Sequence, residues 1–154
     1  MEQQSPESIQ NHLWWVIPEK LAGVRKPNPE EVSELQALGI KAIVSVMDDP
    51  SNLDLYEQAN LPHLWLPIKG GTAPTLEKTN QLVNFVQRQN DLGNAVAIHC
   101  TSGRRRTGTA LASYLIHSGF SFEEAMEMIL KANPQVELRE SQINFLQQLA
   151  ASVS

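Results

Sequence analysis

The chain has 154 residues, a length that suits one domain with a substantial core. Its hydrophobic content of 42% and charged content of 19% are near globular averages and exclude a disordered polypeptide. The formal net charge of −5 argues against a general nucleic-acid binder, so we expect no stable nucleic-acid binding. No apolar run approaches the roughly 18 residues of a membrane span, and the polar start is unlike a signal or transit peptide. We therefore expect a cytoplasmic, monomeric protein.

The N-terminal part of the chain predicts a tail followed by a pair of short strands. Residues 1–10 are polar and acidic, and we expect them to form a flexible tail ahead of a single domain at residues 11–154. Apolar runs at residues 12–17 and 20–22 predict two strands, with Gly23 turning the chain after the second. Such a pair is expected to flank a larger sheet.

Strands and helices alternate through the rest of the chain. Helices are predicted at residues 29–38, 53–59, 75–89, 109–117, 121–131 and 139–151. Further strands are predicted at residues 40–46, 63–68 and 95–98. This alternation predicts an α/β fold with a parallel sheet, in which ligands bind beyond the carboxyl ends of the strands.

The segment from residue 95 to residue 109 has the sequence AVAIHCTSGRRRTGT and contains most of the candidate functional residues of the chain. An apolar strand pattern ends at His99 and at the single cysteine, Cys100, and an apolar helical pattern follows. Between residues 92 and 122 there is no Asp or Glu, whereas three successive arginines lie there. Positive charge on one loop of an acidic chain favours a small anionic ligand over a long polyanion.

A cysteine and an arginine separated by five residues, here Cys100 and Arg106, predict a phosphate-binding loop at such a strand-to-helix turn. Unpaired backbone N–H groups at a helix start converge on phosphate oxygens, and a planar guanidinium can bind two of those oxygens at once. Gly103 eases the backbone into the turn. Inorganic phosphate or sulfate is expected to bind there as well. The predicted phosphate-binding residues are Thr101, Ser102, Gly103, Arg104, Arg105 and Arg106.

The same positive field predicts a reactive thiol. It is expected to lower the pKa of Cys100, and Thr107 can donate its hydroxyl to the thiolate. A thiolate beside bound phosphate predicts phosphoryl transfer through a cysteinyl-phosphate that water then hydrolyses, with no metal or other cofactor. The alternative is a buried structural cysteine beside a solvated turn. That alternative leaves the coincidence of strand, spacing, glycine, arginine and helix start unexplained.

The string HCTSGRRRTGT resembles the signature loop of the cysteine-dependent protein tyrosine and dual-specificity phosphatases. Asn11 and the segments WVIP (residues 15–18), LAG (residues 21–23) and AIVS (residues 42–45) resemble the small atypical dual-specificity phosphatases, so the resemblance covers roughly residues 11–150. It implies a three-layer fold in which helices flank a four- to five-stranded, mostly parallel sheet. It also implies Cys100 as nucleophile, Arg106 as phosphate ligand, and a phosphoprotein or other phosphomonoester as substrate.

One departure from that family concerns the general acid. Relatives place an aspartate just after the strand that here ends at residues 66–68, but this chain continues with Lys69, Gly70 and Gly71. Protonation of the leaving oxygen needs an acid within hydrogen-bond reach. Asp48 and Asp49 follow a neighbouring strand, and we assign Asp48 as the acid. Asp49, or no side-chain acid at all, stays open, as does a merely solvated turn.

The sequence thus predicts a protein tyrosine or dual-specificity phosphatase that acts through a cysteinyl-phosphate, and two rival functions stay open. Arg104 and Arg105 either form a solvated basic rim or contact a second phosphate, and such a contact predicts a phosphoinositide or RNA 5′-phosphatase. The missing acid predicts instead a non-catalytic module that binds phosphorylated ligands. Glu137, Glu140 and Gln142 lie where related enzymes orient the hydrolytic water, or else form a turn and a helix face. The choice between phosphotyrosine alone and dual specificity also stays open.

Overall fold

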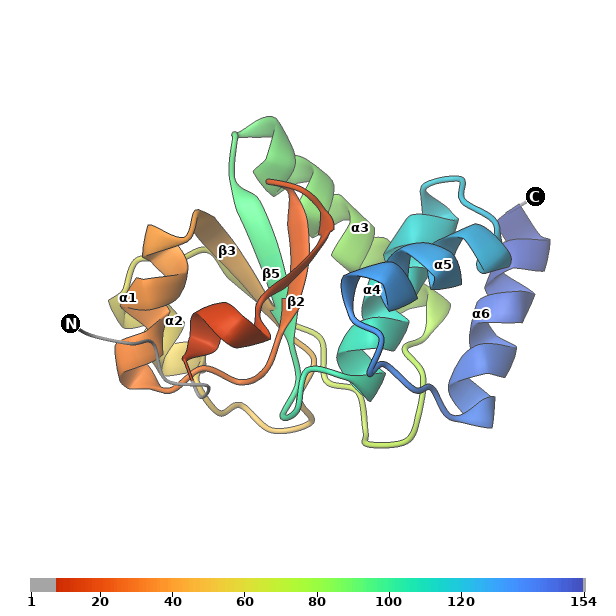
Figure 1. Cartoon of the computed structure of the whole chain (residues 1–154), viewed down its shortest axis with the longest axis horizontal. Coiled ribbons are helices and arrows are strands. Elements are labelled where there is room, and N and C mark those ends of the chain that lie inside the picture. The colour runs from red at the N-terminus through yellow and green to blue at the C-terminus, as the bar shows by residue number, and fades with distance from the viewer. Residues whose placement is uncertain (1–7, 154) are drawn as a thin grey trace.

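The computed structural model describes residues 8–153, which fold around one five-stranded sheet (Figure 1). The strands lie in the order β1-β2-β5-β3-β4, with β1 antiparallel to β2 and the other neighbours parallel. The strands are β1 (Trp14–Ile17), β2 (Leu21–Val24), β3 (Ile40–Ser45), β4 (His63–Trp65) and β5 (Ala95–His99). The predicted mostly parallel sheet, with the first pair at its edge, is confirmed.

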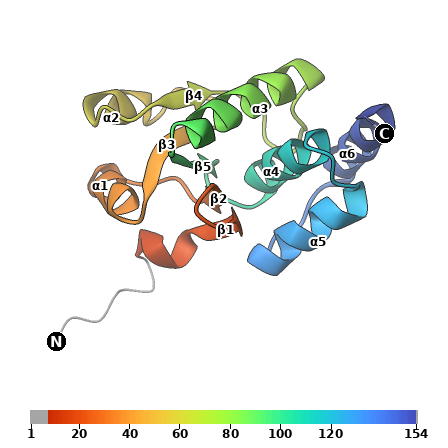
Figure 2. The same ribbon diagram turned by 90° about the horizontal axis from the view of Figure 1, so that it is seen from above.

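Helices cover both faces of the sheet, which gives the predicted three layers (Figure 2). One face packs against the short 3₁₀ helix η1 (Ile9–His12), α1 (Pro29–Ala37) and α2 (Leu53–Gln58). The other packs against α3 (Leu76–Asp91), α4 (Arg105–His117), α5 (Phe122–Ala132) and α6 (Glu140–Val153). β3 and β5 are buried at all but one position, Lys41, because the sheet is covered on both sides.

Side-chain caps explain why several helices begin where the sequence predicts. The Asn28 side chain accepts a hydrogen bond from the backbone N–H of Glu31, whose carboxylate accepts one from the Asn28 N–H in return. Ser121 and Glu124 form the same reciprocal pair at α5. These boxes satisfy backbone donors that a helix start otherwise leaves unpaired.

Three predictions about local structure need correction. Gly23 lies inside β2 and does not turn the chain; a side chain there would meet the Trp14 ring at 2.4 Å. α4 begins at Arg105, four residues before the predicted start. The expected tail falls mostly outside the described residues, since residues 1–7 are not described. However, Ile9 is fully buried in η1, so the fold begins before residue 11.

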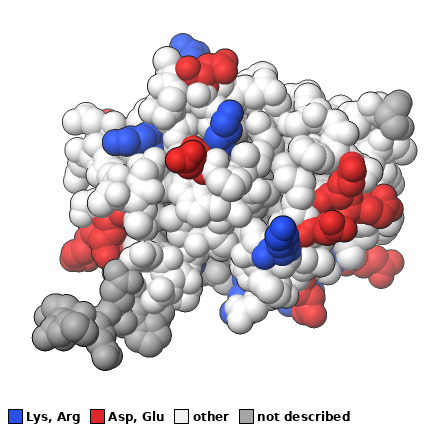
Figure 3. Space-filling view, turned by 45° about the horizontal axis from the view of Figure 1, so that its top comes forward, with Lys and Arg blue, Asp and Glu red and all other residues white. Residues whose placement is uncertain are grey.

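The carboxyl ends of β2, β5 and β3 meet at the lower edge of the sheet in Figure 1. Figure 3 brings the opposite, upper side forward, where basic side chains stand singly and acidic ones gather at the end formed by α5 and α6. The three successive arginines lie instead at the lower edge, in the loop that follows β5. The positive charge of this acidic chain is therefore locally concentrated there.

Candidate active site

The loop from Cys100 to Arg106, hereafter the phosphate loop, connects β5 to α4 and rests on the end of β2. Gly103 has a φ of +76°, and a Cβ there would lie 2.7 Å from the backbone of Val24 and Arg25. The Lys26 N–H also donates to the Thr101 carbonyl at 3.2 Å. Only glycine combines this positive φ with so close a backbone contact, so Gly103 sets the shape of the loop.

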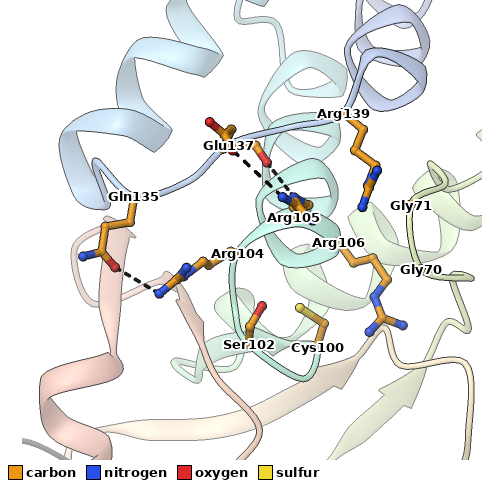
Figure 4. Close-up of a pocket in the computed structure, with 10 residues that line it drawn as sticks. All are labelled: Gly70, Gly71, Cys100, Ser102, Arg104, Arg105, Arg106, Gln135, Glu137 and Arg139. Carbon is orange, nitrogen blue, oxygen red and sulfur yellow. Dashed lines mark hydrogen bonds and ion pairs between the residues drawn. The ribbon is translucent and has the colours of Figure 1, made fainter.

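The phosphate loop forms the floor of a cavity of about 350 Å³, hereafter the catalytic cavity. In Figure 4 the Cys100 sulfur and the Ser102 hydroxyl face its centre. Its described lining residues are Gly70, Gly71, Cys100, Ser102, Arg104, Arg105, Arg106, Gln135, Glu137 and Arg139. Four of these ten are arginines and one is a carboxylate, so the cavity is suited to an anion. It brings together most of the predicted phosphate-binding set; Thr101 and Gly103 lie beside it.

The surroundings of Cys100 favour its thiolate. Burial of the thiol raises its pKa, but the Thr107 hydroxyl and the N–H groups of Thr107, Gly103 and Arg104 lower it further, so the pKa lies below its usual value. The Gly103 N–H donates to Sγ at 3.3 Å. The Thr107 hydroxyl is buried, and no oxygen or nitrogen of residues 8–153 bonds to it. The Thr107 hydroxyl is therefore the side-chain donor to the Cys100 sulfur.

Replacing Thr107 with valine tests this electrostatic role. Thr107→Val removes the hydroxyl at nearly constant volume, so the pKa of Cys100 should rise toward its usual value. Because the thiolate is the reactive form, the acidic limb of kcat/KM and the rate of alkylation by iodoacetamide both shift to higher pH. Thr109→Val is the matched control, since the Thr109 hydroxyl donates to the Arg105 carbonyl. A lower rate with an unmoved pH profile contradicts the role.

Arg106 lies at the side of the catalytic cavity, where three groups hold its guanidinium. Nη1 donates to the Ile68 carbonyl at 3.0 Å and lies 3.5 Å from Asp48 Oδ1, while Nη2 donates to Thr101 Oγ1 at 3.4 Å. Its side chain is 15% exposed. The planar group is thus fixed beside the thiol before any substrate arrives.

The two predicted acids occupy different positions. Asp48 is half-exposed and lies on Arg106, outside the lining of the catalytic cavity. Asp49 accepts a hydrogen bond from the Ser51 N–H at 2.9 Å. Hydrogen bonds from the Ser51 hydroxyl and N–H lower the pKa of Asp49, which favours its ionised form. Of the two, Asp48 is therefore the one placed next to the phosphate-binding machinery.

Sequence reasoning missed Arg139 and Gln135, which reach the catalytic cavity from the connection between α5 and α6 (Figure 4). They carry no local motif, so nothing in the sequence marks them. Glu137 lies there too, with its carboxylate 3.9 Å from Arg105. Gln142 does not face the cavity: it is buried, and its amide donates to the Thr72 carbonyl and accepts from the Arg139 N–H.

His99 is part of a buried network behind the thiol. Its Nε2 lies 2.8 Å from the Tyr56 hydroxyl and its Nδ1 lies 3.2 Å from the Cys100 carbonyl. Burial lowers the pKa of His99 to about 4, so the ring is neutral at neutral pH. Within residues 8–153, no group of three or more His, Cys, Asp or Glu side chains is placed to hold a metal ion.

The site combines a buried thiol, backbone N–H groups that surround it and a fixed arginine, at the carboxyl end of a mostly parallel sheet. This combination defines the class of cysteine-dependent phosphatases. A comparison with family models agrees. The chain belongs to the family described as PTP-SAK, Swiss Army Knife protein, DSP-PTPase phosphatase domain, whose model matches residues 10–152.

Relatives and solved structures give the same class. The chain is 30% identical over 135 residues to phosphatidylglycerophosphate phosphatase PTPMT2 from Arabidopsis thaliana, covering 84% of this chain and 59% of that protein. It is 35% identical over 82 residues to phosphatidylglycerophosphatase and protein-tyrosine phosphatase 1 from Rattus norvegicus, covering 53% of this chain and 42% of that protein. The chain thus matches between two and three fifths of these relatives' lengths.

The structure resembles Tk-PTP in its active form, with a TM-score of 0.83 and 27% identity over 91% of this chain and 97% of that one. The similarity confirms the phosphatase fold predicted from the signature loop. Among the helices of residues 8–153, none is both long and apolar enough to cross a bilayer.

Proposed function

We propose that the protein hydrolyses phosphomonoesters through a cysteinyl-phosphate. The Cys100 thiolate attacks phosphorus, the bond to the ester oxygen breaks, and that oxygen takes a proton. Water then attacks the cysteinyl-phosphate and releases phosphate and the thiolate. Arg106 and the N–H groups of the phosphate loop stabilise the charge on the transferring group. The lowered pKa of Cys100 and the fixed guanidinium support this sequence of steps.

The catalytic cavity favours a small hydrophilic alcohol as the leaving group. None of its ten described lining residues carries an aliphatic or aromatic side chain, and this observation carries the proposal. A phenyl ring gains little there, because aromatic groups bind best against apolar walls. A phosphorylated glycerol or polyol head group matches such polar, arginine-rich walls. Two relatives are named for phosphatidylglycerophosphate, which has such a head group.

Protein phosphatase activity, on phosphotyrosine or with dual specificity, is the second candidate. The family description and the name of the rat relative both favour it. The phosphate loop can act on either substrate, since it contacts the phosphate group and not the alcohol or phenol that is released.

A substrate panel separates the candidates. We expect kcat/KM for phosphatidylglycerophosphate in detergent micelles to exceed that for a phosphotyrosine peptide by at least about tenfold. Phosphoinositides and an RNA with a 5′-phosphate complete the panel and test the remaining alternatives. The reverse order between lipid and peptide overturns the lipid proposal. Phosphate binding without turnover of p-nitrophenyl phosphate between about pH 5 and pH 8 indicates a non-catalytic module.

Asp48 is proposed as the acid that protonates the leaving oxygen. Its Oδ1 lies 3.5 Å from Arg106 Nη1, which places this carboxyl group beside the phosphate that Arg106 binds. Asp48→Asn should therefore slow glycerol phosphate hydrolysis about a hundredfold, and p-nitrophenyl phosphate hydrolysis much less, because nitrophenolate leaves unprotonated. Asp49→Asn is the matched control. Equal losses of rate on both substrates would exclude Asp48 as the acid and would limit its role to positioning Arg106.

A further inference from the structure

A second cavity adjoins the phosphate loop on the side of the N-terminal segment, hereafter the N-terminal cavity. It has a volume of about 430 Å³ and shares Ser102, Arg104 and Gln135 with the catalytic cavity. The Arg104 guanidinium donates to Gln135 Oε1 at 3.4 Å (Figure 4), and both residues line both cavities. The two cavities therefore adjoin, and a molecule whose phosphate lies over Cys100 has the N-terminal cavity beside it.

The wall of the N-terminal cavity carries a buried imidazole nitrogen that the fold leaves unsatisfied. His12 is the last residue of η1 and lines this cavity. Its Nε2 is buried and has no hydrogen-bond partner among residues 8–153. Buried polar atoms nearly always have a partner in the protein, in ordered water or in a ligand. The fold thus leaves His12 Nε2 without a hydrogen-bond partner next to the phosphate loop, and the proposed chemistry over Cys100 does not use it.

Two arginines and one carboxylate lie around this imidazole, and the carboxylate of Glu31 interacts electrostatically with both His12 and Arg25. Arg25 and Arg104 line the N-terminal cavity, and no described residue of its lining is Asp or Glu. The Glu31 carboxylate lies outside the lining and binds Arg25 through two hydrogen bonds of 2.9 and 2.8 Å, which fixes that guanidinium. Side-chain amides complete the polar wall, and Leu13 and Trp14 form an apolar part. Arg104, in contrast to Arg25, is paired with no carboxylate of residues 8–153 and binds only the neutral Gln135 amide, so its guanidinium beside the imidazole is a setting for an anion.

We propose that the N-terminal cavity binds a second phosphate group of the same substrate molecule, with His12 and Arg104 as its contacts. This inference rests on the proposed function and narrows it to alcohols that carry two phosphates. One is the monoester over Cys100; the other, a monoester or a diester, accepts hydrogen bonds from His12 Nε2 and from the guanidinium. A lipid head group and a free bisphosphate share this chemistry.

The test compares substrates with one and two phosphates in His12→Ala. The substrates are p-nitrophenyl phosphate, glycerol bisphosphate, and phosphatidylglycerophosphate in detergent micelles. The kcat/KM for a two-phosphate substrate, divided by that for p-nitrophenyl phosphate, should fall about tenfold in His12→Ala. His117→Ala, at the end of α4, is the matched control and should keep the wild-type ratio. His12→Gln retains a donor of similar reach and should restore most of it.

The outcomes separate this inference from the proposed function. A fall with both two-phosphate substrates supports a site for the shared chemistry, and a fall with the micellar lipid alone identifies the lipid head group. An unchanged ratio in a His12→Ala protein of wild-type melting temperature overturns the inference and leaves the phosphatase activity standing. If the wild type turns over none of the substrates, the proposed function fails. In that case the affinities for glycerol bisphosphate and for inorganic phosphate, each measured by titration, still test the cavity. His12→Ala should weaken the binding of glycerol bisphosphate and leave that of inorganic phosphate unchanged.

Discussion

Cys100→Ser should lower turnover of any phosphomonoester by roughly four orders of magnitude or more, because a neutral hydroxyl replaces the attacking thiolate. The thiol is 2% exposed, and its pKa is lowered by Thr107 and by the N–H groups of the loop. None of these groups ionises a serine hydroxyl at neutral pH. Initial rates with p-nitrophenyl phosphate and with a lipid phosphate measure the loss.

Binding of phosphate should survive the same substitution. The N–H groups of the phosphate loop and Arg106 remain, and the thiolate charge that repels a dianion is gone, so the affinity for inorganic phosphate should equal or exceed that of the wild type. The rise in melting temperature with added phosphate measures it, since a ligand that binds only the folded state stabilises that state. Cys100→Ala is the companion variant, because it lacks any hydroxyl. Turnover within tenfold of wild type in either variant would remove Cys100 as the nucleophile.

Much of this site is predictable because its chemistry is local in sequence. The backbone from Cys100 to Thr107 supplies the N–H groups, the glycine, the nucleophile and the guanidinium within eight residues. The apolar run before it places the thiol at a strand end, and the absence of carboxylates nearby predicts an anion site. The Asn28 and Ser121 caps are local for the same reason, and both helices begin as expected.

The rest depends on contacts between distant segments. Arg139 reaches the catalytic cavity because Gln142 and Ser141, at the start of α6, bond to the carbonyls of Thr72 and Gly71 in another loop. Spacing along the chain gives no sign of that pairing. Likewise, the sequence predicts a turn at Gly23, whereas in the structure the Trp14 ring occupies the space that a side chain at this position would need.

The ends of elements follow the same rule. The strand predicted to reach residue 68 is regular only to Trp65, although the N–H groups of Leu66 and Ile68 still donate to β3 and to the residue after it. Pro67, between them, has no N–H to donate. The sequence predicts the start of α4 too late because its first turn, residues 105–108, holds two arginines that line the cavity, a threonine and a glycine, and so shows no apolar periodicity.

Arg106→Lys should lower kcat by roughly 10²- to 10³-fold although the charge is kept, a loss comparable to removing one oriented donor from an oxyanion site. The guanidinium is held between the Ile68 carbonyl, Asp48 and Thr101, so its plane is set before phosphate arrives. A lysine ammonium offers a point charge on a flexible stem and cannot bind two oxygens in one plane. Single-turnover and steady-state rates with p-nitrophenyl phosphate separate the chemical step from binding.

The neighbouring arginine provides the matched control for that experiment. Arg105 is about half-exposed and pairs with the exposed Glu137 at the rim, so Arg105→Lys changes the same chemical group without removing the fixed fork. With a substrate that has one phosphate, its effect should be within a few fold, because exposed charge pairs contribute little. Similar losses in the two variants would mean that charge alone matters at this cavity. A much larger loss in Arg106→Lys would identify the two-oxygen grip as the part of this loop that stabilises the transferring phosphoryl group.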